Sequence, residues 1–561
     1  MFYNDKLAGN GEQIVELMAN HFQTAYINYG NNNDGISHAS SVAFDKFALD
    51  ITLEETFQYL SNLRSNYSCG PDNIPNFFLK QCKYSLSIPI NNIFSKSLRF
   101  GIFPSAWKES FIKPVHKSGP KDNIKNYRGD SIQSSIPKLF DEIISEKLSK
   151  ICTPHLNPVQ HGFVQHKSTT TNLLDYRSFL TEALEEHLQV DSIYTDFSKA
   201  FDRVDHSILK KKLTHWGFPD YFVSWVYSFV TGRTQRVKID NFTSSVVFVH
   251  SGVPQGSHLG PILFNIFIND LTDSVKFSNC LLFADDLKIF RVIRDKQAQE
   301  LLQEDLLEIN RWCISNNLFL NVNKCVSISF CRNKHPLSKV YSINSHNLKQ
   351  CTDVKELGVI FDCKLTFQKH IYEMCTRASK TWGFIYRTSK DFNINTLKIL
   401  YMSLVRSQQE YAASIWSPHF TGDIQHIERV QKRCMRHFEY KLGISHSHGD
   451  YSKILNILDL STLESRRIIT NLMTLYKLIN HEILITDIEK HIIFHIPTRN
   501  TRTPHIFNVP LRRDNYTMNS PLTRFVRLGN KFSKREWFQM SASCFKCLVS
   551  RSVNNNSRVL M

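Results

Sequence analysis

The stretch "CLLFADDLKIF", Cys280–Phe290, decides the fold because it places two carboxylates between two short apolar runs. Two strand-like runs joined by a tight link predict a β-hairpin, although the link lacks the Asn-Gly or Asp-Gly pair that most strongly marks such turns. Asp285 and Asp286 would then stand side by side at its tip. Asp is also a common turn residue that caps local backbone groups, so this stretch alone leaves a solvated turn and a chemical site both open.

A second acidic position lies upstream, in "DSIYTDFSKAFDRVDH", Asp191–His206. Residues 192–197 predict a strand, and Asp196 stands near its end. Phosphoryl-transfer enzymes that clamp two divalent ions about 4 Å apart need carboxylates from different strands. Adjacent carboxylates repel one another, and Mg²⁺ would remove that cost.

A glycine- and proline-rich loop, "HSGVPQGSHLGPILFNIFIND", His250–Asp270, separates the two acidic stretches. Its backbone could lie against a flat partner, and a buried-looking helix follows. Taken alone it is equally an ordinary loop.

Composition narrows the class of protein. The 561 residues carry a net charge of +17, but residues 1–60 hold two Lys or Arg against eight Asp or Glu, so the excess lies further on. Residues 490–535 carry ten Lys or Arg, one acid and several aromatic residues. This composition suits either binding of a nucleic acid or a solvated basic surface.

The sequence also predicts where the protein lies in the cell. It contains thirteen scattered Cys, no secretory signal and no apolar run long enough to cross a membrane. We therefore expect an intracellular protein of the nucleus or cytoplasm that is not secreted and contacts no membrane. The CxxC of Cys544 and Cys547 is interpreted as two thiols.

Local patterns predict the organisation of the chain. Residues 10–28 and 300–316 have the pattern of amphipathic helices, Tyr29–Ser41 that of a polar linker, and Thr52 with Glu55 predicts a helix start. Strands and helices alternate over residues 103–361, and residues 367–480 are mostly helical.

The three motifs, in this order and spacing, resemble the palm of reverse transcriptases, and more closely the polymerases of non-LTR retrotransposons of the jockey-like branch. The resemblance runs from about residue 12 to about residue 530 and includes further segments: "FPSAWKESFIKPVHKSGPKDNIKNYR" (103–128), "HGFVQHKSTTTNLL" (161–174), "NNLFLNVNKCVSISF" (316–330), "KELGVIFDCKLTFQKHI" (355–371), "EYAASIWSP" (410–418) and "IERVQKRCMR" (427–436).

This resemblance implies an RNA-directed DNA polymerase that transfers deoxynucleotides to a primer 3′-hydroxyl on an RNA template. The implied fold is an α+β right-hand polymerase: an N-terminal extension (1–95), fingers and palm with an antiparallel sheet (96–362), a helical thumb (363–480) and a basic C-terminal region (481–561). Its metal ligands would be Asp196, Asp285, Asp286 and the Phe197 carbonyl, holding two Mg²⁺, with Mn²⁺ as an alternative ion.

Other roles are carried over from the same resemblance. Phe201 matches a bulky gate beneath the sugar and Gln255 a loop residue at the new base pair, while Lys117 and Arg128 match basic finger residues that grip the triphosphate. Lys324 matches a lysine proposed to protonate departing pyrophosphate. Phe201 could also be an ordinary core residue, and the lysines ordinary surface charges.

The sequence departs from the family in the fingers. "NYRGDSIQSS" has Gly129 and Asp130 where the family has Pro-Ile, and "GFVQHKST" has Val164 and His166 where it has Arg and Gly. These changes remove positive charge but leave the three Asp intact. A decayed or domesticated element product that binds RNA is therefore the alternative, and an endonuclease function is expected from elsewhere.

Overall fold

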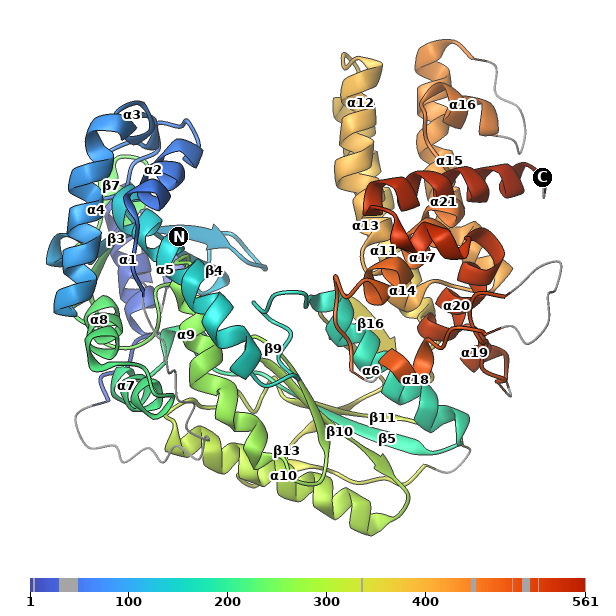
Figure 1. The fold of residues 1–561 in the computed structure, drawn as a ribbon, viewed down its shortest axis with the longest axis horizontal. Helices are drawn as coiled ribbons and strands as arrows, with labels where there is room; N and C mark the ends of the chain where they lie inside the picture. The colour runs from blue at the N-terminus through green and yellow to red at the C-terminus, as the bar shows by residue number, and fades with distance from the viewer. Residues whose placement is uncertain are drawn as a thin grey trace.

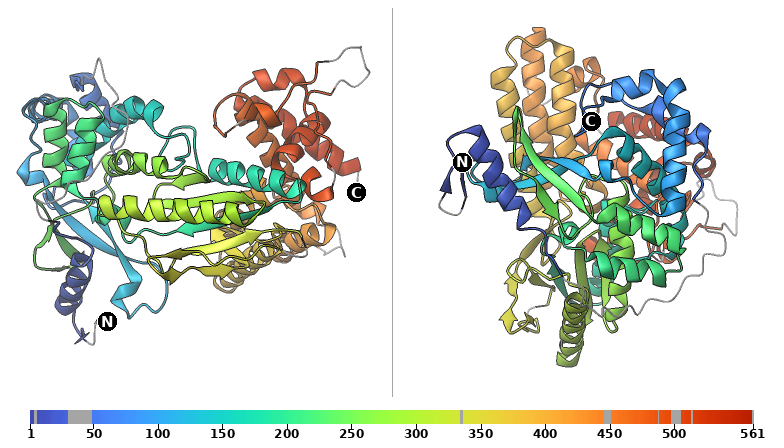
Figure 2. Two further views of the ribbon diagram at one scale, coloured as in Figure 1. Left: turned by 90° about the horizontal axis from the view of Figure 1, so that it is seen from below. Right: turned by 90° about the vertical axis from the view of Figure 1, so that its left-hand side faces the viewer.

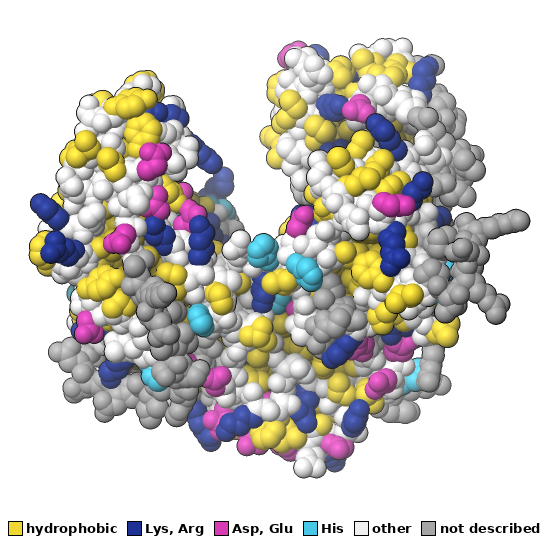
Figure 3. Space-filling model, viewed as in Figure 1, with side chains coloured by type: hydrophobic (Ala, Val, Ile, Leu, Met, Phe, Trp, Pro, Cys, Tyr) yellow, Lys and Arg dark blue, Asp and Glu magenta, His cyan; other side chains and the backbone are white. Residues whose placement is uncertain are grey.

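The computed structural model describes residues 1–3, 6–29, 49–333, 336–444, 451–486, 488–496, 505–512 and 514–559. Two arms rise from a β-sheet floor and enclose a deep cleft, seen as a ribbon in Figure 1 and as a solid surface in Figure 3. Most of residues 1–268 builds the left arm and the residues after about 367 build the right arm, whereas residues 169–195 lie in the floor and beneath the right arm. This arrangement agrees with the right-hand architecture that the sequence predicted. We call the left arm the fingers, the sheet floor the palm and the right arm the thumb.

The palm is a five-stranded sheet in the order β14-β11-β5-β10-β9. The central strand β5 pairs antiparallel with β10 and β11, whereas β14 joins the edge parallel to β11. The predicted hairpin is confirmed as β9 and β10. The strands are β5 (Gln189–Thr195), β9 (Asn279–Phe283), β10 (Asp286–Ile293), β11 (Val326–Phe330) and β14 (Lys349–Cys351).

Helices cover both faces of this sheet. Successive side chains of a strand point to opposite faces, and β10 follows that rule: Ile289 packs in the core with helix α10 (Lys296–Ser315), and Phe290 in the core with helix α6 (Thr169–Glu185). Seen from below, α10 crosses in front of the strands (Figure 2). A sheet buried on both faces is rigid, so it can hold the hairpin tip in one place.

The fingers combine a second sheet with a helical layer. β3 pairs antiparallel with β4 and parallel with β6, which also carries β7 and β8. The strands are β3 (Glu109–His116), β4 (Tyr127–Ile132), β6 (Arg233–Ile239), β7 (Phe242–Thr243) and β8 (Val247–Val249). The helices are α1 (Gly11–Gln23), α2 (Leu53–Asn62), α3 (Asn76–Gln81), α4 (Lys83–Phe100), α5 (Ser135–Cys152), α7 (His206–His215), α8 (Asp220–Val230) and α9 (Leu259–Ile268).

Two local predictions for this arm are confirmed. Thr52 and Glu55 form a complete capping box at the start of α2, in which each side chain accepts from the other residue's backbone N–H. The helix after the glycine-rich loop is α9, and nine of its ten residues are buried. The predicted polar linker Tyr29–Ser41 lies, apart from Tyr29, outside the described residues.

The thumb is helical, as predicted for residues 367–480. A small hairpin of β15 (Asp353–Glu356) and β16 (Val359–Asp362) leads into it. Its helices are α11 (Gln368–Thr388), α12 (Ile394–Leu400), the π-helical turn η6 (Tyr401–Arg406), α13 (Ser407–Glu410), α14 (Ala413–Trp416), α15 (Thr421–Leu442), α16 (Ser452–Ile457) and α17 (Leu463–Ile479).

The C-terminal residues belong to the core of this arm, which their sequence did not reveal. Phe525, Val526 and Phe545 are fully buried in one cluster with Leu472 and Leu475 of α17. The elements are α18 (Ile488–His491), α19 (Asn515–Met518), α20 (Pro521–Phe532) and α21 (Ala542–Val559). Cys544 and Cys547 are exposed free thiols on α21. Within the described ranges no helix is long and apolar enough to cross a membrane.

Candidate active site

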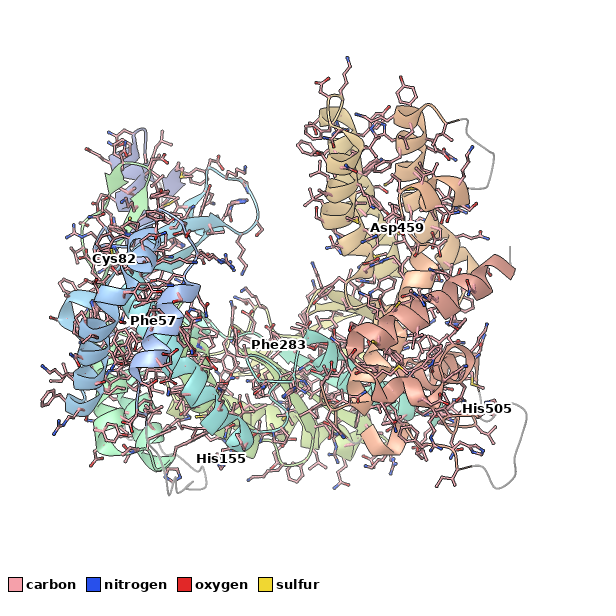
Figure 4. The ribbon with its side chains drawn as sticks, turned by 45° about the horizontal axis from the view of Figure 1, so that its top comes forward. Phe57, Cys82, His155, Phe283, Asp459 and His505 are labelled. Atoms are coloured by element: carbon pink, nitrogen blue, oxygen red, sulfur yellow. The ribbon has the colours of Figure 1, made fainter. Side chains whose placement is uncertain are left out.

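The tip of the β9–β10 hairpin lies at the floor of the cleft, where Figure 4 labels Phe283, the last residue of β9. Phe283 pairs with Asp286, so only Ala284 and Asp285 form the turn. Ala284 has a φ of +55°, the left-handed backbone that a two-residue hairpin turn requires at its first central position. Asp285 thus occupies the tip itself, and Asp286 begins the returning strand.

Asp196 stands beside this pair because of the strand register. Thr195, the last residue of β5, lies opposite Leu287 of β10. One step further along the two antiparallel strands brings Asp196 next to Asp286. The carbonyl of Asp196 accepts from the Asn321 N–H at 2.7 Å, which fixes the chain just beyond the strand. Three carboxylates predicted from two separate motifs therefore lie at the same end of the palm sheet.

The negative charges around the hairpin tip raise the pKa of both of its carboxylates. Burial and the nearby Asp196 raise the pKa of Asp285, while Lys117 and Lys324 oppose that rise. Burial, then the charges of Asp285, Glu356 and Asp196, raise the pKa of Asp286 to about 6. Carboxylates that repel one another gain from a cation placed among them.

Carboxylate oxygens are the ligands that hard divalent ions prefer, so the donor set suits such an ion. The side chains are not gathered in advance, because among the described residues no three His, Cys, Asp or Glu side chains stand close enough together to hold a metal. Lys324 instead forms an ion pair with Asp196, with 3.1 Å between Nζ and Oδ2. The Lys324 side chain is 59% exposed, so this pair is weak and a metal ion could displace it.

A clamp behind the turn went unnoticed in the sequence. Gln160 is buried, and its Oε1 accepts from the Ala284 N–H at 2.9 Å and the Gly162 N–H at 2.8 Å, while its Nε2 donates to the Ala284 carbonyl at 3.2 Å. Gly162 lies so close that a Cβ there would be 2.2 Å from the Ala284 nitrogen. The backbone of the turn is therefore fixed from behind by a loop 124 residues away.

A buried charge network supports the returning strand. Lys288 of β10 is 2% exposed; it donates to Asn172 Oδ1 at 2.6 Å, forms an ion pair with Glu356 and lies over the Tyr176 ring at 4.3 Å. Lys288 is two residues beyond Asp286, so both project from the same face of β10. Nothing in an alternating strand pattern marks such a lysine as buried.

Phe201 and Gln255 lie on neighbouring segments, as the glycine-rich loop packs against the turn after β5. The Val253 N–H donates to the Phe201 carbonyl at 2.8 Å, and Gln255 Nε2 donates to Asp202 Oδ1 at 2.7 Å. The half-buried Phe201 ring stacks on Phe264 at 4.4 Å between centroids. Phe197, two residues beyond the end of β5, is buried.

The basic finger residues are exposed. Lys117 follows β3 and its charge acts on Asp285. Arg128 on β4 forms an ion pair with Asp130, 3.5 Å between Nε and Oδ1, and their side chains are 63% and 50% exposed. The unusual acid noted in the sequence thus engages the residue expected to grip phosphate.

The basic segment 490–535 is only partly described, and several of its cations have internal contacts. Arg512 forms an ion pair with Glu185, Arg527 donates to the Met518 carbonyl at 3.1 Å, and Arg535 lies over the Phe494 ring. Part of the positive charge of this segment is therefore used in contacts within the protein.

Residues 115–361 match the family described as reverse transcriptase (RNA-dependent DNA polymerase). The matched segment runs from β3 to β16 and contains all three carboxylates. This segment is therefore similar to the reverse transcriptases, a family whose members use divalent metal ions.

The curated relatives of the chain are polymerases of mobile elements. The chain is 31% identical over 333 residues to the RNA-directed DNA polymerase from mobile element jockey of Drosophila melanogaster, covering 57% of this chain and 36% of that protein. It is 29% identical over 401 residues to the jockey polymerase of Drosophila funebris, covering 69% and 43%. It is 26% identical over 454 residues to the probable RNA-directed DNA polymerase from transposon BS of Drosophila melanogaster, covering 77% and 50%. The chain is thus similar to the polymerases of non-LTR retrotransposons, the resemblance that the sequence motifs predicted, and it spans half the length of these relatives or less.

Among solved structures, apo telomerase from Candida tropicalis matches 67% of this chain and 66% of its own, with a TM-score of 0.37 and 12% identity.

Proposed function

We propose that this chain synthesises DNA on an RNA template, adding deoxynucleotides to the 3′-hydroxyl of a DNA primer. The observation that supports this proposal is the meeting of Asp196, Asp285 and Asp286 at the floor of the cleft, with Lys117 and Lys324 close enough to act on Asp285. The template and primer would lie between fingers and thumb, across the end of the palm sheet.

The three carboxylates, with the Phe197 carbonyl, would hold two Mg²⁺, with Mn²⁺ as an alternative. Such ions lower the charge of the phosphates and stabilise the attacking and leaving oxygens. Lys324 starts in an ion pair with Asp196. Once released from that pair, it would donate a proton to departing pyrophosphate.

The remaining residues would bind and orient the nucleotide. Lys117 and Arg128 would contact the triphosphate from the fingers, Arg128 only after leaving Asp130. Phe201 would close the space beneath the sugar, and Gln255, held by Asp202, would touch the new base pair.

Primer extension with the purified chain tests the proposal. A DNA primer annealed to RNA should be extended in the presence of Mg²⁺ and deoxynucleotides, and sequencing should show products complementary to the template. Extension that stops when any one complementary deoxynucleotide is omitted would exclude untemplated addition. Tight binding of the RNA–primer duplex without any extension, in Mg²⁺ and in Mn²⁺, would contradict the proposal and favour an RNA-binding product.

A further inference from the structure

A cavity of about 480 Å³ lies where the palm, the thumb and the C-terminal helices meet. Its walls come from α6, the end of β11, the link before α11, the link between α14 and α15, and helices α19 and α20. We call it the arginine pocket, after Arg177, Arg332 and Arg524 in its lining; Lys364 adds a fourth cation. The volume lies in the range of small-ligand sites.

The three guanidinium groups have no carboxylate partner among the residues that the structure describes, since none stands within 4.0 Å of an Asp or Glu oxygen. Arg177 is 4% exposed, and its Nε has no hydrogen-bond acceptor. The Nε of Arg524 is also buried without an acceptor. Buried charges in proteins are normally paired, so the guanidinium groups of Arg177 and Arg524, with the exposed Arg332 and Lys364 beside them, make the cavity suited to an anion.

The acids nearest to these cations are already engaged. Asp362, close to Arg177, accepts from the backbone N–H groups of Lys364, Thr366 and Phe367. Asp514, in the lining, caps α19 by accepting from Thr517. The lining contains one other acid, Asp423, for which the described residues show no hydrogen bond from a backbone N–H.

The guanidinium groups are held in place by other contacts. Arg177 and Arg332 lie over the Tyr516 ring, 4.7 and 3.7 Å from its centroid. Arg524 donates to the carbonyls of Ser414 at 2.6 Å and Asn519 at 2.9 Å. Anchored guanidinium groups lose little entropy on binding an anion, and their planar donors match phosphate.

Aromatic surface and position add to the chemistry of the pocket. Phe420 in the lining is 55% exposed, and its ring lies 4.1 Å from that of His419, offering a face on which a base could stack. A second hollow shares Arg524 with the pocket and is lined by His505, which Figure 4 labels on the outer side of the right arm, away from Phe283 in the cleft.

We propose that the arginine pocket binds the phosphate of a nucleotide, with its base against Phe420, at a site separate from the catalytic cleft. The nucleotide belongs either to a single strand of RNA or DNA outside the cleft or to a free nucleoside phosphate. This site also gives the basic aromatic segment 490–535 a specific role, because Tyr516 and Arg524 come from it.

The test is equilibrium binding without divalent metal, using 5′-phosphorylated hexauridine and, separately, AMP. The variant Arg332→Gln/Lys364→Gln removes two exposed cations of the pocket, so it should fold normally. The control Arg294→Gln/Lys349→Gln removes an exposed Arg and an exposed Lys from the palm.

We expect the pocket variant to bind hexauridine at least tenfold more weakly than wild type, and the control to stay within threefold. The slope of log affinity against log salt should fall by about 1.4 for two lost phosphate contacts with a single strand. If AMP shows the same loss at similar affinity, the source is a free nucleotide; if only hexauridine does, it is a strand. Equal affinities and slopes for all three proteins, with both probes, would overturn the proposal and leave the arginines as structural.

Discussion

Replacing Gln160 by Ala should slow nucleotide addition without weakening the binding of template and primer. The side chain makes three hydrogen bonds, two of them to the Ala284 peptide beside Asp285. None of these hydrogen bonds involves a carboxylate, so the substitution would change the rate only by changing the position of the turn.

The magnitude follows from the burial of these bonds. Gln160 is 2% exposed, and a buried backbone group left without a partner costs about 1–3 kcal/mol. Water entering the space left by the side chain would restore part of that, so we expect a net local loss of about 2–4 kcal/mol for three groups. A turn that loses this much stabilisation can move, and a displacement of the Asp285 carboxylate by about 1 Å would lower turnover roughly a hundredfold.

The assay is single-nucleotide incorporation under single-turnover conditions, with primer–template affinity measured in parallel. Gln303→Ala is the matched control, because Gln303 also clamps one residue, accepting from the Ser342 N–H and donating to its carbonyl, both at 2.9 Å. That clamp lies on α10, not at the hairpin tip.

We therefore expect a tenfold to hundredfold slower step in Gln160→Ala and less than a threefold change in Gln303→Ala, with affinities unchanged in both. Equal rates in the two variants would refute the reasoning, since the turn would then hold its shape without Gln160.

Three further predictions follow from contacts in the same region. Glu356→Gln leaves Lys288 as a buried charge without its carboxylate and should cost about 3–5 kcal/mol of stability in urea unfolding, whereas Lys288→Met/Glu356→Leu should recover most of it; a loss below about 1 kcal/mol in the single variant would contradict the pairing. Phe201→Val should lower the preference for deoxynucleotides over ribonucleotides by tenfold or more in kcat/KM; an unchanged ratio with a lower Tm would mean that its stacking on Phe264 is purely core packing. Asp130→Asn should lower the KM for deoxynucleotides by up to about fivefold, because an exposed pair is worth up to about 1 kcal/mol; an unchanged KM would mean that Arg128 does not reach the triphosphate.

The hairpin and its carboxylates could be predicted from the sequence because the patterns that indicate them lie within short stretches of the chain. Two apolar runs define β9 and β10, and an acid at a strand end defines the position of Asp196. Their order and spacing matched a known family, which supplied the pairing of strands that periodicity alone does not give.

The supporting contacts were not readable because they join distant segments. Gln160 and Ala284 are 124 residues apart, and Lys288 and Glu356 are 68 apart. Lys288 resembles an ordinary polar residue of a half-exposed strand until α6 and β15 cover that face. The sequence likewise did not predict the packing of the C-terminal helices, because their apolar residues are buried by contacts with the distant helix α17.

That packing also changes how the basic segment should be tested. A truncation ending near Asn480, which the sequence alone would suggest, would remove the buried Phe525 and Phe545 and expose the core of the thumb. Substitution of exposed cations tests nucleic-acid binding without that loss.

The most direct test of the central claim is the rate of single-nucleotide incorporation by Asp285→Asn, beside wild type, on an RNA template with Mg²⁺. The variant keeps the size and the hairpin position of the side chain but removes the charge that would bind the ion. The account predicts a loss of about a thousandfold or more, because several kcal/mol of metal-dependent stabilisation disappear, with primer–template affinity unchanged. Incorporation by Asp285→Asn at close to the wild-type rate would contradict the assignment of these carboxylates as the catalytic metal site.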